Sequence, residues 1–366
     1  MRLLVGADSA EPIGGNTRVA FEVAAGLSQR GHQVDLAYRN PGALLEPYRQ
    51  SFRNVRRVRG WYVQPRVAAR SSVSVVLAVR TATRDPHDAV YVHWLGHAFW
   101  GGLVASLQRV PLVCHLHGLP GRMGLQSAWA RGRVDRYVAV SHHVAQVWAG
   151  TGVDPGRVTV VHNGVDVDEY SPGDSDKTAL GLGPDQRVVL YAGRVSPTKG
   201  IHVLLEAWAL LGLAPTDAAL VIAGLPREEE QDAGGRSYLD RLHRATTGAV
   251  HWVRRQVDIV PWYRAADVVV VPSLWAEPFG RVVIEALACA RPVVASRVGG
   301  IPEILTGGLA ELLVEPDDAG QLARRIRDLI DWREHSPELG DQCRRHVKRD
   351  FSLGQMLDGV EAVLTA

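Results

Sequence analysis

The sequence is poor in cysteine and in long apolar runs, and each shortage excludes a class of protein. Its 366 residues include three cysteines, Cys114, Cys289 and Cys343, which are too few and too scattered for a disulfide framework or a zinc site. No apolar run approaches the roughly 20 residues that span a bilayer. A strand-like run, residues 2–8, follows Met1 directly, so we expect no secretory signal and a cytoplasmic protein.

Lysine is absent from the first half, and acidic residues are scarce there. Residues 1–165 contain 19 arginines, no lysine and nine acidic residues, a net charge of +10, whereas the remainder carries −8. Opposite signs in the two halves favour two domains with different partners. No module that reads nucleic acid is recognisable, so we expect no nucleic-acid partner.

The stretch from Pro47 to Arg84 has nine arginines and no acidic residue. Such a stretch favours an anionic acceptor or peripheral contact with an anionic membrane at its inner face. The simpler alternative is a solvated basic surface.

Short apolar runs alternate with helical stretches, which predicts an α/β protein with parallel sheets. A segment rich in Asp, Ser, Gly and Pro, residues 163–177, separates the two halves. We therefore predict two doubly wound Rossmann-like domains, residues 1–165 and 166–350, and a C-terminal helix from about Phe351. The predicted strands are residues 3–6, 34–38, 90–93, 112–117, 137–140 and 158–161 in the first half and 188–192, 220–223, 251–253, 268–271 and 293–295 in the second.

The most informative stretch is residues 273–303, which follow the buried strand predicted at 268–271. A turn, a helical run from about Val282 to Ala290 and a second strand make one βαβ unit, and ligands of such sheets bind at the carboxyl ends of the strands. Glu277 lies in this loop. Glu285 lies one turn into the helix, where its side chain tilts back toward the same loop.

A helix N-terminus favours an anion, and carboxylates accept hydrogen bonds from hydroxyl groups. A sugar nucleotide offers both. The alternative is that Glu277 caps the helix and Glu285 faces solvent.

The segment AEPFGRVVIEALACARPVVAS, followed by VGGIPE, resembles the E-x7-E signature of the family-4 retaining glycosyltransferases of GT-B fold. The resemblance implies two Rossmann-like domains that face a cleft, with the last helix crossing back onto the first domain. It also implies transfer of a hexose from a nucleotide diphosphate sugar, UDP- or GDP-linked, to an acceptor hydroxyl with retention of configuration.

The resemblance assigns roles in the second half. Arg194 and Lys199 match the pattern G-R-x-x-x-x-K-G, whose cations clamp the donor diphosphate, so neither a metal nor a cofactor besides the sugar nucleotide is expected. Glu277 is expected to bind sugar hydroxyls and Glu285 ribose hydroxyls. The residues expected to offer backbone groups are Phe279, Gly280 and Arg281, for sugar and phosphate, and Val253 and Arg254, for the nucleobase.

In the first half, Gly14 and Gly15 precede an amphipathic helix that Asn16 or Thr17 can cap, and Asn16 is placed on the acceptor side. The pair is not GxGxxG, which argues against a Rossmann dehydrogenase. It matches the family's first loop, which touches donor and acceptor.

His115 and His117 share one face of a strand, but no third ligand follows at a suitable spacing, so no metal site is expected. By resemblance, His117 contacts the donor sugar, with His115 as the alternative. His93 and Trp94 face the acceptor, and Ser141 caps a helix and lines the cleft.

The acceptor stays open between two classes. One is a small polar molecule, such as a cyclitol, a sugar phosphate or an aminoglycoside precursor. The other is a lipid or polysaccharide at the membrane. A sugar-nucleotide epimerase of GT-B fold and a non-catalytic sugar-nucleotide sensor are the alternative functions.

Overall fold

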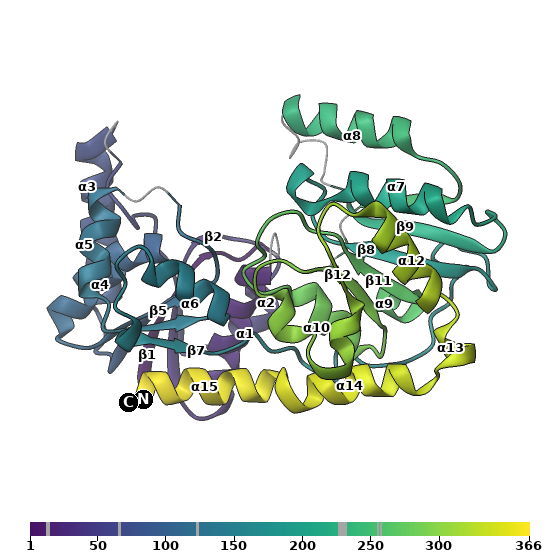
Figure 1. The fold of residues 1–366 in the computed structure, drawn as a ribbon. Helices are drawn as coiled ribbons and strands as arrows, with labels where there is room; N and C mark the ends of the chain where they lie inside the picture. The colour runs from purple at the N-terminus through teal and green to yellow at the C-terminus, as the bar shows by residue number, and fades with distance from the viewer. Residues whose placement is uncertain (12–14, 65–66, 122–123, 226–232, 255, 257) are drawn as a thin grey trace. The chain divides into compact units, whose positions relative to one another are not determined.

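The computed structural model describes residues 1–11, 15–64, 67–121, 124–225, 233–254, 256 and 258–366 (Figure 1). Its chain forms two compact units. The first contains Met1–Asn163 and Gly354–Ala366, and the second contains Gly164–Leu353. The domains predicted from the sequence were residues 1–165 and 166–350, with the C-terminal helix beginning at about residue 351. None of the helices within the described ranges is both long and apolar enough to cross a membrane.

The first unit is built on a sheet of seven parallel strands. In spatial order they are β3 (Asn54–Arg57), β2 (Gln33–Asn40), β1 (Arg2–Ser9), β4 (Ala89–Val92), β5 (Leu112–Leu116), β6 (Arg136–Ala139) and β7 (Val158–Val160). The strand order reverses between β1 and β4, which is where such sheets bind ligands. Every residue of β4 and β5 is buried, as expected for central strands with helices on both faces.

The helices of the first unit lie on both faces of its sheet (Figure 1). They are α1 (Gly15–Gln29), α2 (Leu45–Arg49), α3 (Ala68–Ala82), α4 (Ala98–Gln108), α5 (Leu125–Arg133), α6 (His142–Ala149) and α15 (Leu353–Thr365). The amphipathic helix predicted after Gly14 and Gly15 is confirmed as α1, whose apolar residues Ala20, Val23, Ala24 and Leu27 are all buried. One expectation was wrong: α1 begins at Gly15, so Asn16 and Thr17 lie in its first turn and do not cap it.

The C-terminal helix α15 packs against α1 within the first unit. A Cβ at Gly26 would lie 2.4 Å from Leu357 Cδ1, so the absent side chain of Gly26 is what lets the helices approach. Arg30 Nη1 donates to Glu361 Oε2 at 2.8 Å. Both chain ends lie close together in this unit (Figure 1).

The second unit repeats the same topology in a sheet of six parallel strands. In spatial order they are β10 (Val250–Arg254), β9 (Ala218–Leu225), β8 (Arg187–Ala192), β11 (Val268–Val271), β12 (Val293–Ser296) and β13 (Leu313–Val314). Its helices are α7 (Ile201–Leu211), α8 (Ala233–Ala245), α9 (Val260–Ala265), α10 (Arg281–Ala288), α11 (Ile301–Ile304), α12 (Ala319–Leu329), α13 (Trp332–His335) and α14 (Glu338–Asp350). The order reverses between β8 and β11.

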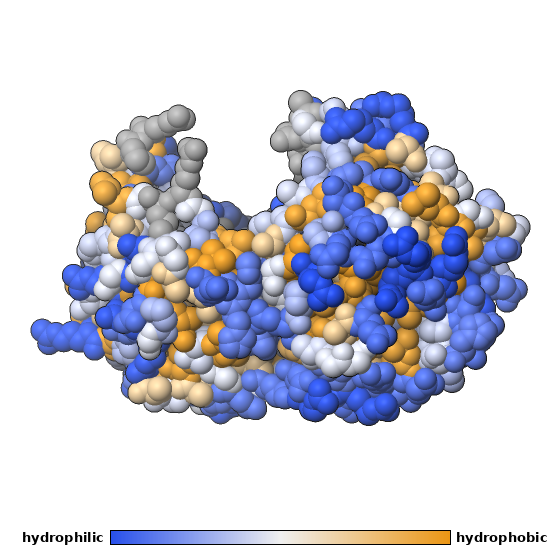
Figure 2. All heavy atoms as spheres, in the orientation of Figure 1, coloured by the Kyte–Doolittle hydropathy of each residue, from blue (hydrophilic) through white to orange (hydrophobic). Residues whose placement is uncertain are grey.

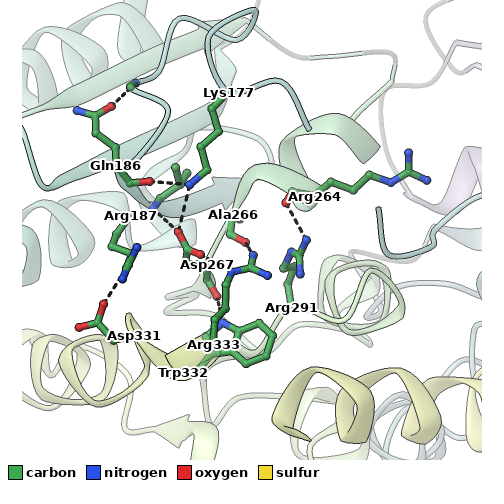
Figure 3. A network of polar contacts seen from close by, with 12 residues as sticks. Lys177, Gln186, Arg187, Arg264, Ala266, Asp267, Arg291, Asp331, Trp332 and Arg333 are labelled. Carbon is green, nitrogen blue, oxygen red and sulfur yellow. Dashed lines mark hydrogen bonds and ion pairs between the residues drawn. The ribbon is translucent and has the colours of Figure 1, made fainter. Parts of the chain in front are cut away.

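A buried carboxylate ties this sheet together at the amino ends of β8 and β11. Asp267, 2% exposed, accepts from the Val188 backbone N–H at 2.8 Å and from Arg333 Nε at 2.7 Å (Figure 3). Lys177 Nζ lies 3.8 Å from the same carboxylate, and Trp332 Nε1 donates to the Asp267 carbonyl at 2.8 Å. The network thereby joins two strands to the segment that carries α13.

Candidate functional site

The loops that follow β8 and β11 are bound to each other at the carboxyl edge of the second sheet. Leu274 N–H donates to Thr198 O at 2.9 Å. Gly200 has a φ of 69°, and a Cβ there would lie 1.9 Å from Pro272 O, so only glycine allows this approach. The contact brings Lys199, at the end of a short helical turn (Pro197–Lys199), to the loop that holds Glu277.

Glu277 is buried, at 8% exposure, and polar groups from three segments hold its carboxylate and its backbone in place. Lys199 Nζ forms an ion pair with its Oε1, and Ser273 Oγ donates to the same oxygen. The Gly300 N–H donates to the Glu277 carbonyl at 2.8 Å. Gly300, which follows β12, therefore has a structural role, because it fixes the backbone of the loop that holds Glu277.

The two predicted cations differ in their surroundings. Lys199 Nζ lies 5.6 Å from the centroid of the Trp275 ring, so an aromatic face and the Glu277 carboxylate both stabilise its charge. The Arg194 side chain is exposed, while Tyr191 Oη donates to the Arg194 carbonyl at 2.8 Å. Lys199 is thus held in place before a ligand binds, whereas no hydrogen bond or ion pair holds the Arg194 side chain within the described part of the chain.

The Glu285 carboxylate is also buried, and both of its oxygens are hydrogen-bonded. Tyr263 Oη donates to Oε2 at 3.0 Å, and Arg281 Nε donates to Oε1 at 2.7 Å. Burial first, and then the Glu285 carboxylate, raise the pKa of Tyr263 well above its usual value, so the phenol stays a donor. The alternative in which Glu277 caps a helix and Glu285 faces solvent is wrong.

Helix α10 begins between the two carboxylates. Gly280, its N-cap, has a φ of 108° and offers no side-chain cap, and Arg281 opens the first turn. The Phe279 ring is buried and lies 5.9 Å from the Phe351 ring, which leaves only its backbone for a ligand. That this turn binds a ligand through its N–H groups, which favour an anion, stays a prediction.

Val253 and Arg254 lie at the end of β10, an edge strand of the second sheet. The pairing of β10 with β9 shifts register between these two residues. Gln256 Nε2 donates to the Arg254 carbonyl at 2.7 Å, so a nucleobase would have to share or replace that bond. Their role in reading the base stays a prediction.

The first unit contains a cavity of about 200 Å³ at the carboxyl edge of β1 and β4. Its lining consists of Ala7, Ser9, Asn16, Thr17, Ala20, His93, Trp94 and His97. Three of the predicted acceptor residues, Asn16, His93 and Trp94, thus share one cavity. Gly15 starts α1 nearby, and Gly14 lies outside the described residues.

Three buried histidines lie beside this cavity. His93 Nδ1 and His117 Nε2 are 3.0 Å apart, and the His115 and His117 rings are tilted by 30° with their centroids 3.9 Å apart. His115 Nδ1 is 2.6 Å from Tyr91 Oη. Burial, followed by the neighbouring histidines, lowers the pKa of both His93 and His115, so both rings are neutral at pH 7.

His93 is a third candidate metal ligand that the sequence did not reveal. One nitrogen from each of His93, His115 and His117 lies within 4.8 Å of the others. No third ligand follows His117 at a suitable spacing in the chain, whereas parallel pairing of β4 with β5 places His93 beside it in space. Absence of a metal therefore remains a prediction.

We expect the first unit to lose stability as the pH falls below about 6.5. His93 and His115 have folded pKa values below the unfolded value of 6.5, so the unfolded chain binds more protons in acid. Each ring contributes a slope of at most about 1.4 kcal/mol per pH unit. Thermal melts between neutral and mildly acidic pH measure this dependence of stability on pH. His115→Asn should flatten the slope, whereas His335→Asn, at an exposed site, should not. Equal acid sensitivity in His115→Asn and wild type would contradict the assignment.

Ser141 caps α6 as predicted, since its Oγ accepts from the Val144 N–H at 3.0 Å. The residue is fully buried. Its role toward an acceptor stays a prediction.

Two family models match the chain. Residues 13–169 match Glycosyltransferase Family 4, and residues 186–331 match Glycosyl transferases group 1. The D-inositol 3-phosphate glycosyltransferase 1 of Catenulispora acidiphila is 36% identical over 355 residues, which cover 87% of this chain and 82% of the relative. The D-inositol 3-phosphate glycosyltransferase of Mycolicibacterium vanbaalenii is 35% identical, and the match covers 68% of this chain and 61% of that relative. The chain thus spans less than two thirds of that second relative.

Solved structures resemble the whole chain. The crystal structure of Anabaena HepE (Alr3699) in complex with UDP and glucose has a TM-score of 0.83 at 24% identity and covers 100% of both chains. The sucrose-phosphate synthase of Thermosynechococcus elongatus has a TM-score of 0.81 at 20% identity and covers 100% of this chain and 98% of its own. These likenesses confirm the predicted GT-B fold class.

Proposed function

Because the chain belongs to glycosyltransferase family 4, we propose that it moves a hexose from a nucleotide diphosphate sugar to an acceptor hydroxyl and retains the anomeric configuration. The observation that carries this proposal is the second-unit cluster of Lys199, Glu277 and Glu285. Its two buried carboxylates flank a helix N-terminus, and a lysine is held at the same loop. Hydroxyl-binding and anion-binding groups of this kind suit a sugar nucleotide.

In the proposed reaction the acceptor oxygen bonds to the anomeric carbon as the bond from that carbon to the diphosphate breaks. A β-phosphate oxygen of the leaving nucleotide takes the acceptor proton. Lys199 and Arg194 stabilise the negative charge that develops on the diphosphate. Glu277 binds sugar hydroxyls, and His117 contacts the sugar from the first unit. The chain thus needs no protein nucleophile.

The similar proteins guide the choice of substrates. The HepE structure holds UDP and glucose, so a uridine donor is the first to test. The relatives of similar sequence are named for transfer to D-inositol 3-phosphate, so a small cyclitol is the first acceptor to test. The residues that line the first-unit cavity in the described part of the chain include no Arg or Lys, which favours a polyhydroxyl ring over a phosphorylated one.

The test of the proposal is a thermal-shift panel with UDP, GDP, ADP and dTDP and their common hexose conjugates, followed by product analysis with candidate acceptors. One nucleotide should stabilise the protein, and Glu285→Ala should abolish that shift. Conversion of the donor without an acceptor would identify an epimerase instead, and binding without turnover of any acceptor would favour a sensor. Activity should persist in EDTA, because cationic side chains replace a metal.

Tyr263 orients Glu285 toward the ribose, and Tyr263→Phe is expected to raise the donor KM roughly tenfold with little change in kcat. A hydrogen bond to a charged group contributes about 1.5–3 kcal/mol. Because the effect passes through ribose hydroxyls, the preference for the nucleotide over its 2′-deoxy analogue should shrink in the variant. A purely structural role would lower the melting temperature and leave that preference unchanged. Tyr238→Phe, on α8, is the matched control.

A further inference from the structure

Helix α3 of the first unit carries an apolar stripe on its exposed face. Val73, Val76 and Leu77 are 58%, 64% and 57% exposed. Val76 and Leu77 lie three and four residues after Val73, so the three side chains lie on one side of the helix. Single exposed apolar residues are ordinary, but three adjacent ones on one helix face indicate a contact surface. Figure 2 shows apolar side chains exposed over this helix.

The opposite face of α3 is buried against the rest of the first unit. Val75, Ala78, Val79 and Ala82 are buried, and the helix packs against α4. The exposed stripe therefore takes no part in the core of this unit.

Arginines flank the stripe at both ends. Arg70 lies one turn before Val73, and Arg80 lies one turn after Leu77; both are exposed. Among the described residues, no ion pair joins Arg70 or Arg80 to a carboxylate, in contrast with Arg53 and Arg56, which pair with Asp35 and Asp85. The positive charge along α3 is thus left for a partner outside the chain.

We propose that this face of α3 binds the surface of an anionic membrane, with the helix lying in the plane of the interface. An apolar stripe bordered by unpaired cations is the pattern of an interfacial helix. A second copy of the chain is a poorer occupant, because the stretch from Pro47 to Arg84 has no carboxylate and would set arginine against arginine. Membrane binding through α3 does not depend on the reaction or on the acceptor.

The test is co-sedimentation of the full chain with phosphatidylcholine vesicles, with and without phosphatidylglycerol. Binding is expected only with the anionic lipid at low salt, and it should be lost at about 1 M salt, where charges are screened within about 3 Å. Each arginine near such a surface contributes about a fivefold factor, so R70Q/R80Q should lower the partition coefficient about 30-fold. V76D/L77D should abolish binding although both arginines remain.

Leu210→Asp is the matched control, because Leu210 is 57% exposed on α7 of the second unit. It should bind vesicles as wild type does, and thermal melts should show all variants folded. Absence of binding to anionic vesicles, or equal binding by V76D/L77D and wild type, would overturn the proposal. A dimer in light scattering that V76D/L77D dissociates would assign the face to a second copy and overturn it as well.

Discussion

Lys199→Ala is expected to lower kcat by roughly 10²–10³-fold while the protein stays folded, as for loss of one preorganised group that stabilises transition-state charge. Lys199 is positioned before any ligand arrives, between the Glu277 carboxylate and the Trp275 ring. Its charge is therefore available to a leaving diphosphate without reorganisation. Steady-state kinetics at saturating donor measure the effect.

Two variants separate this role from simple charge balance. Lys348→Ala removes an exposed lysine of α14 and should leave kcat unchanged. Lys199→Ala also leaves the buried Glu277 carboxylate without its cation, so it should lower the melting temperature. The double variant K199A/E277Q should recover the melting temperature, but its kcat should stay well below that of E277Q alone. Equal kcat in the double variant and in E277Q would mean that Lys199 serves only to neutralise Glu277.

Asp267→Asn should cost the second unit about 3–5 kcal/mol of unfolding free energy, the usual loss when one partner of a buried ion pair is removed. The asparagine keeps the shape but has no charge for Arg333 and Lys177, and its NH₂ group would face either the Val188 N–H or the Arg333 guanidinium. Urea unfolding followed by tryptophan fluorescence measures the loss, since Trp332 lies in the same network.

Asp240→Asn is the control, an exposed aspartate of α8 whose replacement should change stability by less than about 0.5 kcal/mol. If Asp267→Asn behaved like this control, the network in Figure 3 would contribute little to stability. Donor binding by the folded protein should be retained in both variants, because Asp267 lies at the amino ends of the strands, opposite the cluster of Glu277 and Glu285.

The sequence predicted every central strand, and it missed the two short strands β3 and β13, each at the edge of its sheet. Central strands of a parallel sheet are covered on both faces and so appear as apolar runs. Strand β3 has the sequence NVRR and is only half-buried, so it has no apolar run that would distinguish it from the rest of the basic stretch. Strand β13 has two residues, too few for a pattern.

Some residues of the candidate site were named from the sequence, and those that were missed share one physical cause. Glu277, Glu285 and Lys199 stand in motifs, so local spacing reveals them. Their supports come from elsewhere: Tyr263 reaches Glu285 across 22 residues, and His93 meets His117 across 24. Contacts between elements that are distant in the chain leave no local periodicity. The local supports are Ser273 and Arg281, each four residues before the carboxylate to which it donates.

The packing of α15 on α1 has a consequence for how the chain folds during synthesis. The first unit is discontinuous, because residues 354–366 belong to it and are synthesised after all of the second unit. Domains generally fold in order from the N-terminus as the ribosome elongates the chain. Here the residues of the second unit are all synthesised before those of the first unit are complete. Until Leu357 is made, the face of α1 that contains Gly26 is not covered by α15. The N-terminal unit is thus the last to be completed, and an apolar helix face is open to chaperones until then.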